Sequence, residues 1–415
     1  MGRFFSDAVE TAIQCIYYDL GAGRGQEGYR LLGNAAEAGD ADAYCLLARC
    51  LYGPEYTWPG HRFPTDEPMG DALMRQSVLR GSAIGTLISL RCGVMDKELA
   101  QAMPFASLRE AFDEVLGKAE QGEHFCEMVI GNVYYWWDFL LIEGKGPEDF
   151  PSEEEFHAYV REHALRCEDW YWRSFRGGIS ASGINLARLY AEGEENLIPP
   201  RPEKELELER CGAELGYPPW QYLYACDLYN AGRREEASVL FRQAADAGEP
   251  RAFYNTGYMY EQGTGVPQDY ARAAEYYARA LDAPSASSAY PAARLGMLAY
   301  MGYGVPKARD RAFRLLRWAD DRGCRTGIFY LGLCYFYGYG TEQDYARARE
   351  CFEAFPGDDP DKCYLLGWIY CNGQGAPEDI PRGVAWLQKA GDHPAAQEEL
   401  QRYRQTRFTR RWVRK

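Results

Sequence analysis

Long apolar runs are absent from this 415-residue sequence, in which no stretch of about 18 consecutive apolar residues occurs. Because a transmembrane helix needs about that length, we expect no membrane partner. The first residues lead into Glu10 and Gln14 rather than into the apolar stretch of a secretion signal. We therefore expect a cytoplasmic protein.

Residues that commonly carry catalysis or bind metals are also scarce, with only five histidines in the chain. His163 and Cys167 are four residues apart on an expected helix, but no second ligand pair follows at a fixed spacing. Ser180 and Ser182 do not fit the Gly-x-Ser-x-Gly turn of a hydrolase nucleophile. Glu153 to Glu155 is interpreted as a solvated helix start. The sequence therefore predicts no metal, no cofactor and no enzymatic activity.

The thirteen cysteines show no pair that recurs at one spacing, as a disulfide in each repeat would require. Cys363 and Cys371 fall on one expected helix, too far apart along its axis to bond. We expect free, buried thiols that pack as small apolar residues.

The net charge is −15, but Gln401 to Lys415 contains seven Arg and Lys and no acid, so the rest of the chain carries −22. An acidic body argues against nucleic-acid binding. The tail alternates arginines with Tyr403, Phe408 and Trp412, which leaves a contact with RNA or an acidic membrane as an alternative. The preferred interpretation is a capping helix with its cations at the negative end of the helix dipole.

Glycine, in contrast, is abundant and regularly placed. Four turns of the form Gly-x-Gly begin at Gly263, Gly302, Gly338 and Gly373, and these glycines are 39, 36 and 35 residues apart. This spacing is typical of a repeated helix pair. No strand precedes these turns and no lysine follows in the position of a phosphate loop, so they are not nucleotide sites.

Each helix before such a turn carries a further glycine six residues earlier, which costs about 1 kcal/mol relative to alanine. These glycines predict that another helix approaches closely. After the turn, an aspartate is placed to cap the second helix in three of the repeats. The helix glycines are Gly257, Gly296, Gly332 and Gly367, and the expected caps are Asp269, Asp344 and Asp379.

These features resemble the Sel1-like repeat family, a relative of the tetratricopeptide fold. The matching elements are Leu/Gly in the middle of the first helix, a tyrosine near its end (Tyr260, Tyr335 or Tyr370), the G-x-G-V/A-P-x-D turn, and A-x-x-W/Y-Y/L-x-x-A in the second helix. The resemblance covers about the last third of the chain. It implies a right-handed α-solenoid that serves as a protein-interaction scaffold.

Weaker copies extend back to the start of the chain. We predict an all-α, right-handed α/α solenoid of about ten helix pairs, with degenerate repeats and loop insertions in 1–251, four clear repeats in 252–391, and a capping helix and basic tail in 392–415. The expected helices before the clear repeats are 7–20 with 26–39, 41–52 with 71–80, 82–92 with 108–120, 125–137 with 156–175, 184–192 with 203–215, and 221–229 with 234–247.

Three turns within these pairs are enlarged, at 53–70, 138–152 and 193–202. Because all three occupy the same place in the repeat, they are expected on one edge of the solenoid, where insertions often form a binding edge. The alternative is drift in tolerant surface loops.

One face of the first helices is unexpectedly aromatic. Counting Ala252 as position 1, positions 1, 5, 8 and 9 form the core stripe, and positions 3, 7 and 10 point away from it. A groove that binds a peptide or helix is one interpretation, and lateral packing between successive first helices is the other. The candidate groove residues are Tyr254, Tyr258, Glu261, Met297, Tyr300, Phe329, Leu333, Phe336, Tyr364 and Trp368.

The sequence therefore predicts a protein-binding scaffold or adaptor that captures a protein or peptide segment. Two alternatives from other classes remain. One is a hydrolase that acts on a peptide-like ligand in the groove, and the other is an acidic inhibitor or immunity-type factor for a basic enzyme.

Overall fold

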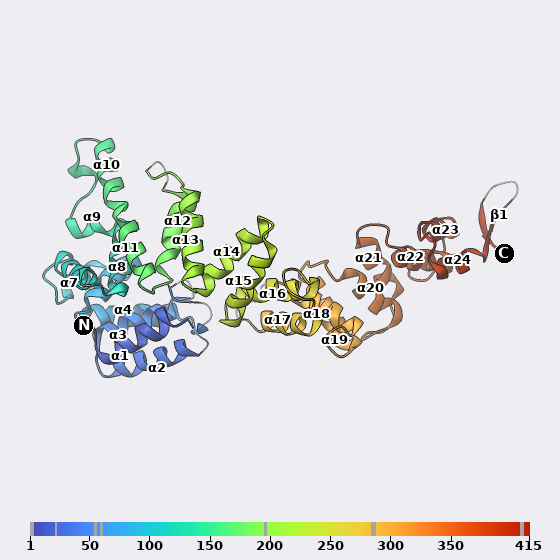
Figure 1. The fold of residues 1–415 in the computed structure, drawn as a ribbon, viewed down its shortest axis with the longest axis horizontal. Coiled ribbons are helices and arrows are strands. Elements are labelled where there is room, and N and C mark those ends of the chain that lie inside the picture. Colours follow the sequence, from blue (N-terminus) through green and yellow to red (C-terminus); the bar gives the residue numbers. More distant parts are fainter. Residues whose placement is uncertain are drawn as a thin grey trace. The chain divides into compact units, whose positions relative to one another are not determined.

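The computed structural model describes residues 4–20, 23–53, 56–58, 61–194, 197–283, 288–406 and 411–415. The described chain divides into unit 1, Met1–Ala252, and unit 2, Phe253–Lys415. Each unit is a stack of helix pairs in the manner of an all-α solenoid (Figure 1). Among the described helices, none is both long enough and apolar enough to cross a bilayer.

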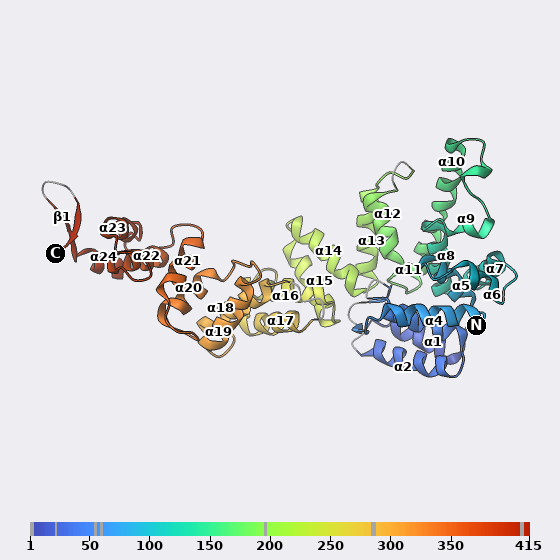
Figure 2. The same cartoon turned by 180° about the vertical axis from the view of Figure 1, so that it is seen from behind.

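The helices of unit 1 follow the expected pairs closely, and neighbouring helices such as α12 and α13 lie side by side in two opposite views (Figures 1 and 2). Additional short helices, α6, α9 and η4, lie between the first and second helices of two of these pairs. The elements are α1 Asp7–Ile13 continued by η1 Gln14–Tyr18, α2 Arg24–Glu37, α3 Ala41–Leu51, α4 Glu67–Leu79, α5 Ala83–Arg91, α6 Lys97–Ala102, α7 Leu108–Glu120, α8 His124–Tyr135, α9 Asp138–Glu143, η4 Pro147–Asp149, α10 Glu153–Ala164, α11 Arg166–Arg176, α12 Ser182–Glu192, α13 Pro202–Glu214, α14 Pro218–Asn230 and α15 Arg234–Asp246.

The helix expected over 156–175 is divided in two. α10 ends at Ala164 and α11 begins at Arg166, with Leu165 as the residue between them. The buried residues keep a three- and four-residue spacing across this break, so the pattern alone predicts one helix. The three acidic residues at 153–155 form the exposed first turn of α10, as expected.

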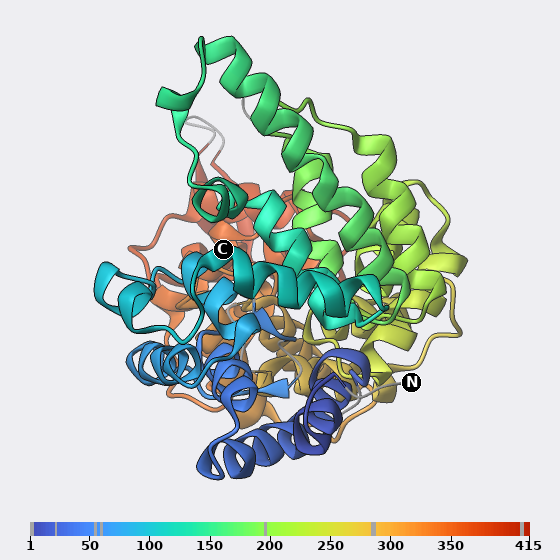
Figure 3. The same cartoon turned by 90° about the vertical axis from the view of Figure 1, so that its left-hand side faces the viewer.

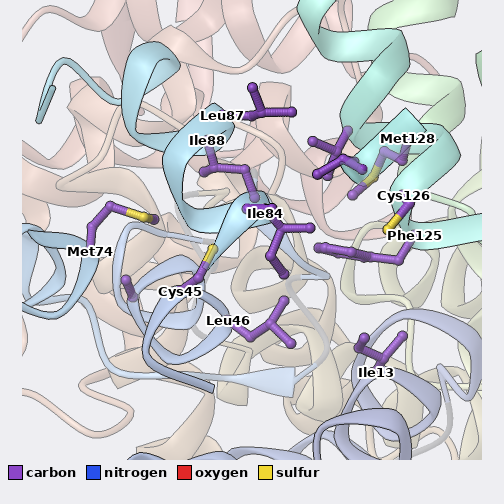
Figure 4. Close-up of a cluster of buried hydrophobic side chains, with 14 of the residues drawn as sticks. Ile13, Cys45, Leu46, Met74, Ile84, Leu87, Ile88, Phe125, Cys126 and Met128 are labelled. Carbon is purple, nitrogen blue, oxygen red and sulfur yellow. The ribbon is translucent and has the colours of Figure 1, made fainter. Parts of the chain in front are cut away.

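The core of unit 1 is formed where several helices meet. Figure 4 shows Ile13 of α1, Leu46 of α3, Ile84 of α5 and Phe125 of α8 converging, and all four side chains are at most 3% exposed. The end-on view in Figure 3 shows these blue and cyan helices gathered together. This continuous apolar core joins successive pairs, because no single pair buries its own apolar face.

The first enlarged turn folds inward. Trp58 is 4% exposed and its Nε1 donates to Oε2 of Glu249, 3.1 Å away and 191 residues later in the chain. His61 is also buried, with its Nε2 2.8 Å from the carbonyl oxygen of Ile16. Thr57, Trp58 and His61 of this insertion are therefore packed into the interior of unit 1, whereas Arg62 and residues 64–66 are exposed. Residues 54, 55, 59 and 60 lie outside the described residues.

The second helix of each pair in unit 2 crosses the first at its glycine. A Cβ built on Gly257 would lie 2.8 Å from the ring of Tyr277, and one on Gly332 would lie 2.6 Å from Phe352. The close approach predicted from the sequence is confirmed. The helices are α16 Pro250–Gln262, whose first residues belong to unit 1, α17 Tyr270–Asp282, α18 Tyr290–Met301, α19 Arg309–Asp320, α20 Ile328–Tyr337, α21 Tyr345–Ala354, α22 Pro360–Asn372, α23 Ile380–Lys389 and α24 Pro394–Leu400.

The helix ends in unit 2 use the expected residues. The side chain of Asp269 accepts from the backbone N–H groups of Ala271 and Arg272 at 3.0 Å, and Asp344 caps α21 in the same way. At the preceding turn, Gly338 has φ 70°, the left-handed conformation that favours glycine. These local signals explain why the helix boundaries were predictable.

The expected capping helix is present only in part, as α24 within 392–415, and it does not continue through the basic tail. After α24 ends at Leu400, the chain forms two short antiparallel strands, β1 Tyr403–Gln405 and β2 Trp412–Arg414. Tyr403 is 3% exposed, whereas Arg404 and Gln405 are exposed, so only the first residue of β1 is buried. Phe408, one of the aromatic residues behind the alternative of a contact with RNA or an acidic membrane, lies outside the described residues.

Candidate functional site

The first helices of unit 2 carry the expected core stripe. Ala252, Thr256, Met259 and Tyr260 are between 0% and 4% exposed. Their burial fixes the orientation of α16 and leaves the opposite side of the helix available for other contacts. The same arrangement recurs in α18, α20 and α22, whose buried residues occupy equivalent positions.

The ten candidate groove residues share that side, but none is fully exposed. Glu261 and Phe336 are buried, at 8% each. The remaining eight are half-buried: Tyr254, Tyr258, Met297, Tyr300, Phe329, Leu333, Tyr364 and Trp368.

Lateral contacts cover part of this set. Phe336 meets Trp368 of the next first helix with ring centroids 5.3 Å apart. Phe329 packs on Phe352 and Phe355 of the second helix, and Tyr364 stacks on His393 at 4.9 Å. Lateral packing therefore covers part of the aromatic stripe, including Trp368 at position 7, and whether the remaining half-buried residues bind a partner stays a prediction.

Glu261 belongs to a buried polar network. Its Oε2 accepts from Tyr277 Oη at 2.5 Å, and its Oε1 is 3.0 Å from Nη1 of Arg294. The guanidinium of Arg294 also lies over the ring of Tyr258, 5.2 Å from its centroid. Burial and the Glu261 carboxylate raise the pKa of Tyr277 well above its usual value, so this hydroxyl remains a donor. The network joins α16 to α17 and α18.

A second set of residues, which the sequence interpretation missed, is more exposed. Tyr290 and Tyr337 are 52% and 48% exposed, and Met301 and Tyr330 are half-buried. Around the helix, positions 3 and 10 lie on one side of position 7, and these four side chains lie on its other side. We call Tyr258, Tyr290, Met301, Tyr330 and Tyr337 the tyrosine face.

Some members of the tyrosine face contact one another directly, and others contact the neighbouring tyrosines Tyr254 and Tyr300. Tyr330 Oη donates to Sδ of Met301 at 3.4 Å, and its ring meets Tyr300 with centroids 5.3 Å apart. Tyr290 packs on Tyr254 at 6.0 Å. The sequence carries a partial signal, because Met301 lies four residues after position 7 of its repeat, and Tyr330 and Tyr337 lie three before and four after position 7 of the next.

Carboxylates border this face. Burial raises the pKa of Tyr330, and the charges of Asp359 and Asp361 raise it further. Burial also raises the pKa of Tyr337, with smaller contributions from Tyr364 and Asp361. Asp361 has an exposed side chain that also contacts His393. A surface of this kind offers apolar contacts together with negative charge.

Unit 1 contains a cavity of about 450 Å³ on its first-helix side. The inward-folded Trp58 forms part of its wall, together with Trp220 of α14 and Ile184 of α12. Trp220 Nε1 donates a hydrogen bond to Oγ of Ser180 at 3.1 Å. Ser180 and the Trp220 indole are therefore structural parts of the cavity wall. The lining is mainly apolar, with Arg251 at one end.

The weak metal and nucleophile candidates have structural roles. Nδ1 of His163 is 2.9 Å from the carbonyl oxygen of Tyr159, and Cys167 is buried on the next helix. Ser182 Oγ pairs with Ser174 Oγ at 2.6 Å. Among the described residues, no group of three or more His, Cys, Asp or Glu is placed to hold a metal ion.

Comparison with known proteins finds a family model that matches the helix pairs of 250–393. The Sel1 repeat model matches residues 250–285, 292–319, 326–354 and 363–393. A curated relative is the ERAD-associated E3 ubiquitin-protein ligase component HRD3A of Arabidopsis thaliana, 32% identical over 81 residues. That match covers 19% of this chain and only 12% of the relative.

Two solved structures are also similar. A Sel1 repeat protein from Oxalobacter formigenes is 25% identical with a TM-score of 0.36, covering 48% of this chain and 82% of that one. The protective antigen c5321 of uropathogenic Escherichia coli strains, which displays an SLR fold, is 19% identical with a TM-score of 0.43 and covers 89% of each chain.

Proposed function

This chain is a Sel1-like repeat protein, and we propose that it is a protein-interaction scaffold whose tyrosine face binds a segment of a partner protein. The observation that carries the proposal is the recurrence of half-exposed tyrosine and methionine side chains on consecutive first helices. Scattered exposed apolar residues are ordinary, but a contiguous aromatic patch favours an interaction site.

The chemistry of the face suits one class of partner. Tyrosine provides a large contact area at low conformational entropy cost and keeps a hydroxyl for hydrogen bonding. Asp359 and Asp361 add negative charge at its border. The proposed occupant is therefore an amphipathic helix that presents apolar side chains flanked by lysine or arginine.

A cytoplasmic location is part of the proposal. All thirteen cysteines are unpaired thiols, and ten of them are buried. Burial raises the pKa of Cys334 to about 12, so this thiol is protonated and unreactive at neutral pH. Such thiols persist in a reducing compartment.

The test compares three forms of the full chain as bait in host lysate, with quantitative mass spectrometry of the captured proteins. The double variant Tyr290→Ser with Tyr337→Ser removes the two most exposed rings of the face. Leu206→Ser is the control, because Leu206 is 47% exposed on α13 of unit 1 and is not part of the tyrosine face. Melting temperatures establish that all three forms are folded.

The proposal expects one or more proteins that the wild type and Leu206→Ser recover equally and that the double variant recovers at least tenfold less. A synthetic amphipathic basic helix taken from such a protein should then bind the wild type directly. If every captured protein is retained by the double variant, the tyrosine face is not the binding site.

A further inference from the structure

The cavity of about 450 Å³ in unit 1 has the size of a small-molecule site, for which about 300–1,000 Å³ is typical. Close packing elsewhere in a protein leaves few spaces larger than one water molecule. At about 30 Å³ for each water, the cavity has room for on the order of 15 non-hydrogen atoms. Because Ile184 both lines the cavity and is 49% exposed, the cavity reaches the surface there, and a small molecule has a path of entry.

Three aromatic side chains form much of the wall. Tyr17, Trp58 and Trp220 are 2%, 4% and 2% exposed. The hydroxyl oxygen of Tyr17 and the indole N–H groups of the two tryptophans are already hydrogen-bonded within unit 1, so the rings are fixed before a ligand arrives. Fixed side chains lose little conformational entropy on binding. The wall is therefore preorganised for an aromatic ligand, which gains ring contacts as well as apolar burial.

Part of the wall is a π-helical turn. The π turn η1, Gln14–Tyr18, continues α1 and contributes Ile16 and Tyr17 to the lining. Such turns are rare, and they occur frequently at functional sites. This backbone feature supports a binding role independently of the size of the cavity.

Two buried hydroxyl groups in the lining are available to an occupant. Thr57 is 6% exposed, and its hydroxyl has no hydrogen-bond partner among the described residues. Ser180 is 5% exposed and accepts from Trp220 Nε1, but its own O–H donates to no group in the described part of the chain. Buried hydroxyl groups are normally hydrogen-bonded. These two are therefore placed to bond a polar group of a ligand.

The charge at the cavity is already balanced. Among the described residues that line it, Arg251 alone is charged, and its Nε is 2.7 Å from Oε1 of Glu249. Glu249 is 0% exposed, so its carboxylate and the guanidinium neutralise each other beside the cavity. A charged ligand would lose its hydration without meeting a free counter-ion. The cavity therefore favours a neutral ligand.

We propose that this cavity, the indole cavity, binds a neutral aromatic small molecule that carries a hydroxyl or carbonyl group. Its rings contact the indoles of Trp58 and Trp220, and its polar group hydrogen-bonds with Thr57 or Ser180. The available volume suits a molecule of about two rings. This inference concerns unit 1 and does not depend on the tyrosine face.

The test measures binding of N-phenyl-1-naphthylamine, a neutral aromatic amine whose fluorescence rises in apolar surroundings, to the full-length protein. The wild type should show saturable binding at a single site. Ala187→Phe places a ring in the cavity from α12 and is expected to weaken binding at least tenfold. Ala191→Phe is the matched control, because Ala191 is exposed one turn further along α12 and does not line the cavity. It should bind the dye as the wild type does.

Competition with the dye tests the chemistry of the ligand. 2-Naphthol should displace it at least tenfold better than 2-naphthoate, which is charged at neutral pH, and severalfold better than 2-methylnaphthalene, which lacks the hydroxyl. The double variant Thr57→Val with Ser180→Ala removes both hydroxyl groups of the cavity. Trp220 Nε1 then keeps the carbonyl oxygen of residue 180 as an acceptor, at 3.2 Å in the wild type. In this variant the advantage of 2-naphthol over 2-methylnaphthalene should disappear.

The double variant Tyr290→Ser with Tyr337→Ser should bind the dye as tightly as the wild type, which separates the indole cavity from the tyrosine face. The proposal is overturned if no saturable binding occurs, if Ala187→Phe binds as the wild type does, or if 2-naphthoate competes as well as 2-naphthol. Melting curves establish that each variant is folded. If Ala187→Phe does not fold, the comparison of 2-naphthol with 2-methylnaphthalene in the hydroxyl variant decides the question.

Discussion

At the scale of single residues, Glu209 of α13 is the buried acid with the clearest consequence for stability. It is 8% exposed, and its Oε2 has no hydrogen-bond partner among the described residues. Burial, and then the nearby Asp227 carboxyl, raise the pKa of Glu209 to about 8. The folded protein therefore keeps this proton at a pH where the unfolded chain has lost it.

The sign of the pH dependence follows from that difference. Between about pH 4.5 and pH 8 the folded state binds more protons than the unfolded state, so the free energy of unfolding falls as the pH rises through this window. We expect the wild type to lose on the order of 2–4 kcal/mol between pH 5 and pH 8 relative to Glu209→Gln. Urea unfolding at the two pH values measures this difference.

Glu207→Gln is the matched control, because Glu207 precedes the buried residue on the same helix but is exposed. It should leave the pH dependence of the wild type unchanged. If the free energy of unfolding changed with pH by the same amount in the wild type and in Glu209→Gln, the Glu209 carboxyl would ionise normally in the folded protein.

Single glycines were the most informative residues in the sequence. Gly296 was predicted to lie under a crossing helix, and a Cβ at that site would lie 2.8 Å from Leu316 of α19. The candidate groove was harder to place, because a helical step identifies a side of a helix but not which neighbour covers it. Glu261 thus joined the buried network with Tyr277 and Arg294, while the exposed Tyr337 was missed.

At the scale of elements, the C-terminal hairpin closes the last helix pair. Tyr403 belongs to the apolar cluster of α22 and α23, and Trp412 packs against the same cluster. Arg414 Nη2 donates to the carbonyl oxygen of Cys371 at 2.9 Å, which satisfies a group near the C-terminal end of α22. The hairpin therefore covers the end of the last helix pair by packing and hydrogen bonding, a role that the sequence analysis gave to a helix.

Removing Thr406 to Lys415 deletes β2 and leaves Tyr403 without its partner strand. We expect the melting temperature to fall by about 2–6 °C, since loss of one half-buried aromatic and a few hydrogen bonds amounts to about 1–2 kcal/mol. Thermal unfolding followed by circular dichroism measures this change. The proposed binding at the tyrosine face should persist, as the tail contributes none of its residues.

Arg411→Ala separates the effect of the hairpin from the effect of charge, because Arg411 is an exposed cation of the same tail. The melting temperature of Arg411→Ala should equal that of the wild type. An unchanged melting temperature for the truncated chain would mean that the two strands contribute nothing to the last repeat.

The inserted elements mark the limit of prediction at this scale. Helix pairs with caps and regular glycines were predicted because each signal is local to the pair. The contact between Trp58 and Glu249 joins residues 191 positions apart, and no local pattern indicates it. The insertion was expected to emerge at an edge. Its Thr57 and Trp58 instead line a cavity, while Arg62 and residues 64–66 are exposed.

At the scale of the whole molecule, the acidity is unevenly distributed. Residues 1–252 contain 24 Lys and Arg against 42 Asp and Glu, a net charge of −18, whereas residues 253–415 contain 22 against 19, a net charge of +3. The tyrosine face therefore belongs to the nearly neutral unit. An inhibitor that recognises a basic enzyme through charge would instead use unit 1.

This asymmetry predicts a different response of the two units to salt. Like charges on unit 1 repel one another, and raising the salt from about 0.05 M to 0.5 M shortens the range of that repulsion well below 10 Å. We expect amide hydrogen exchange in the core helices of unit 1 to slow by about fivefold, equivalent to roughly 1 kcal/mol, while exchange in unit 2 changes little. Exchange detected by mass spectrometry on peptides from α3, α8, α20 and α22 measures both in one sample. Equal slowing in the two units would indicate a general effect of salt on apolar burial rather than relief of charge repulsion, and the acidic surface of unit 1 would then be balanced within the folded structure.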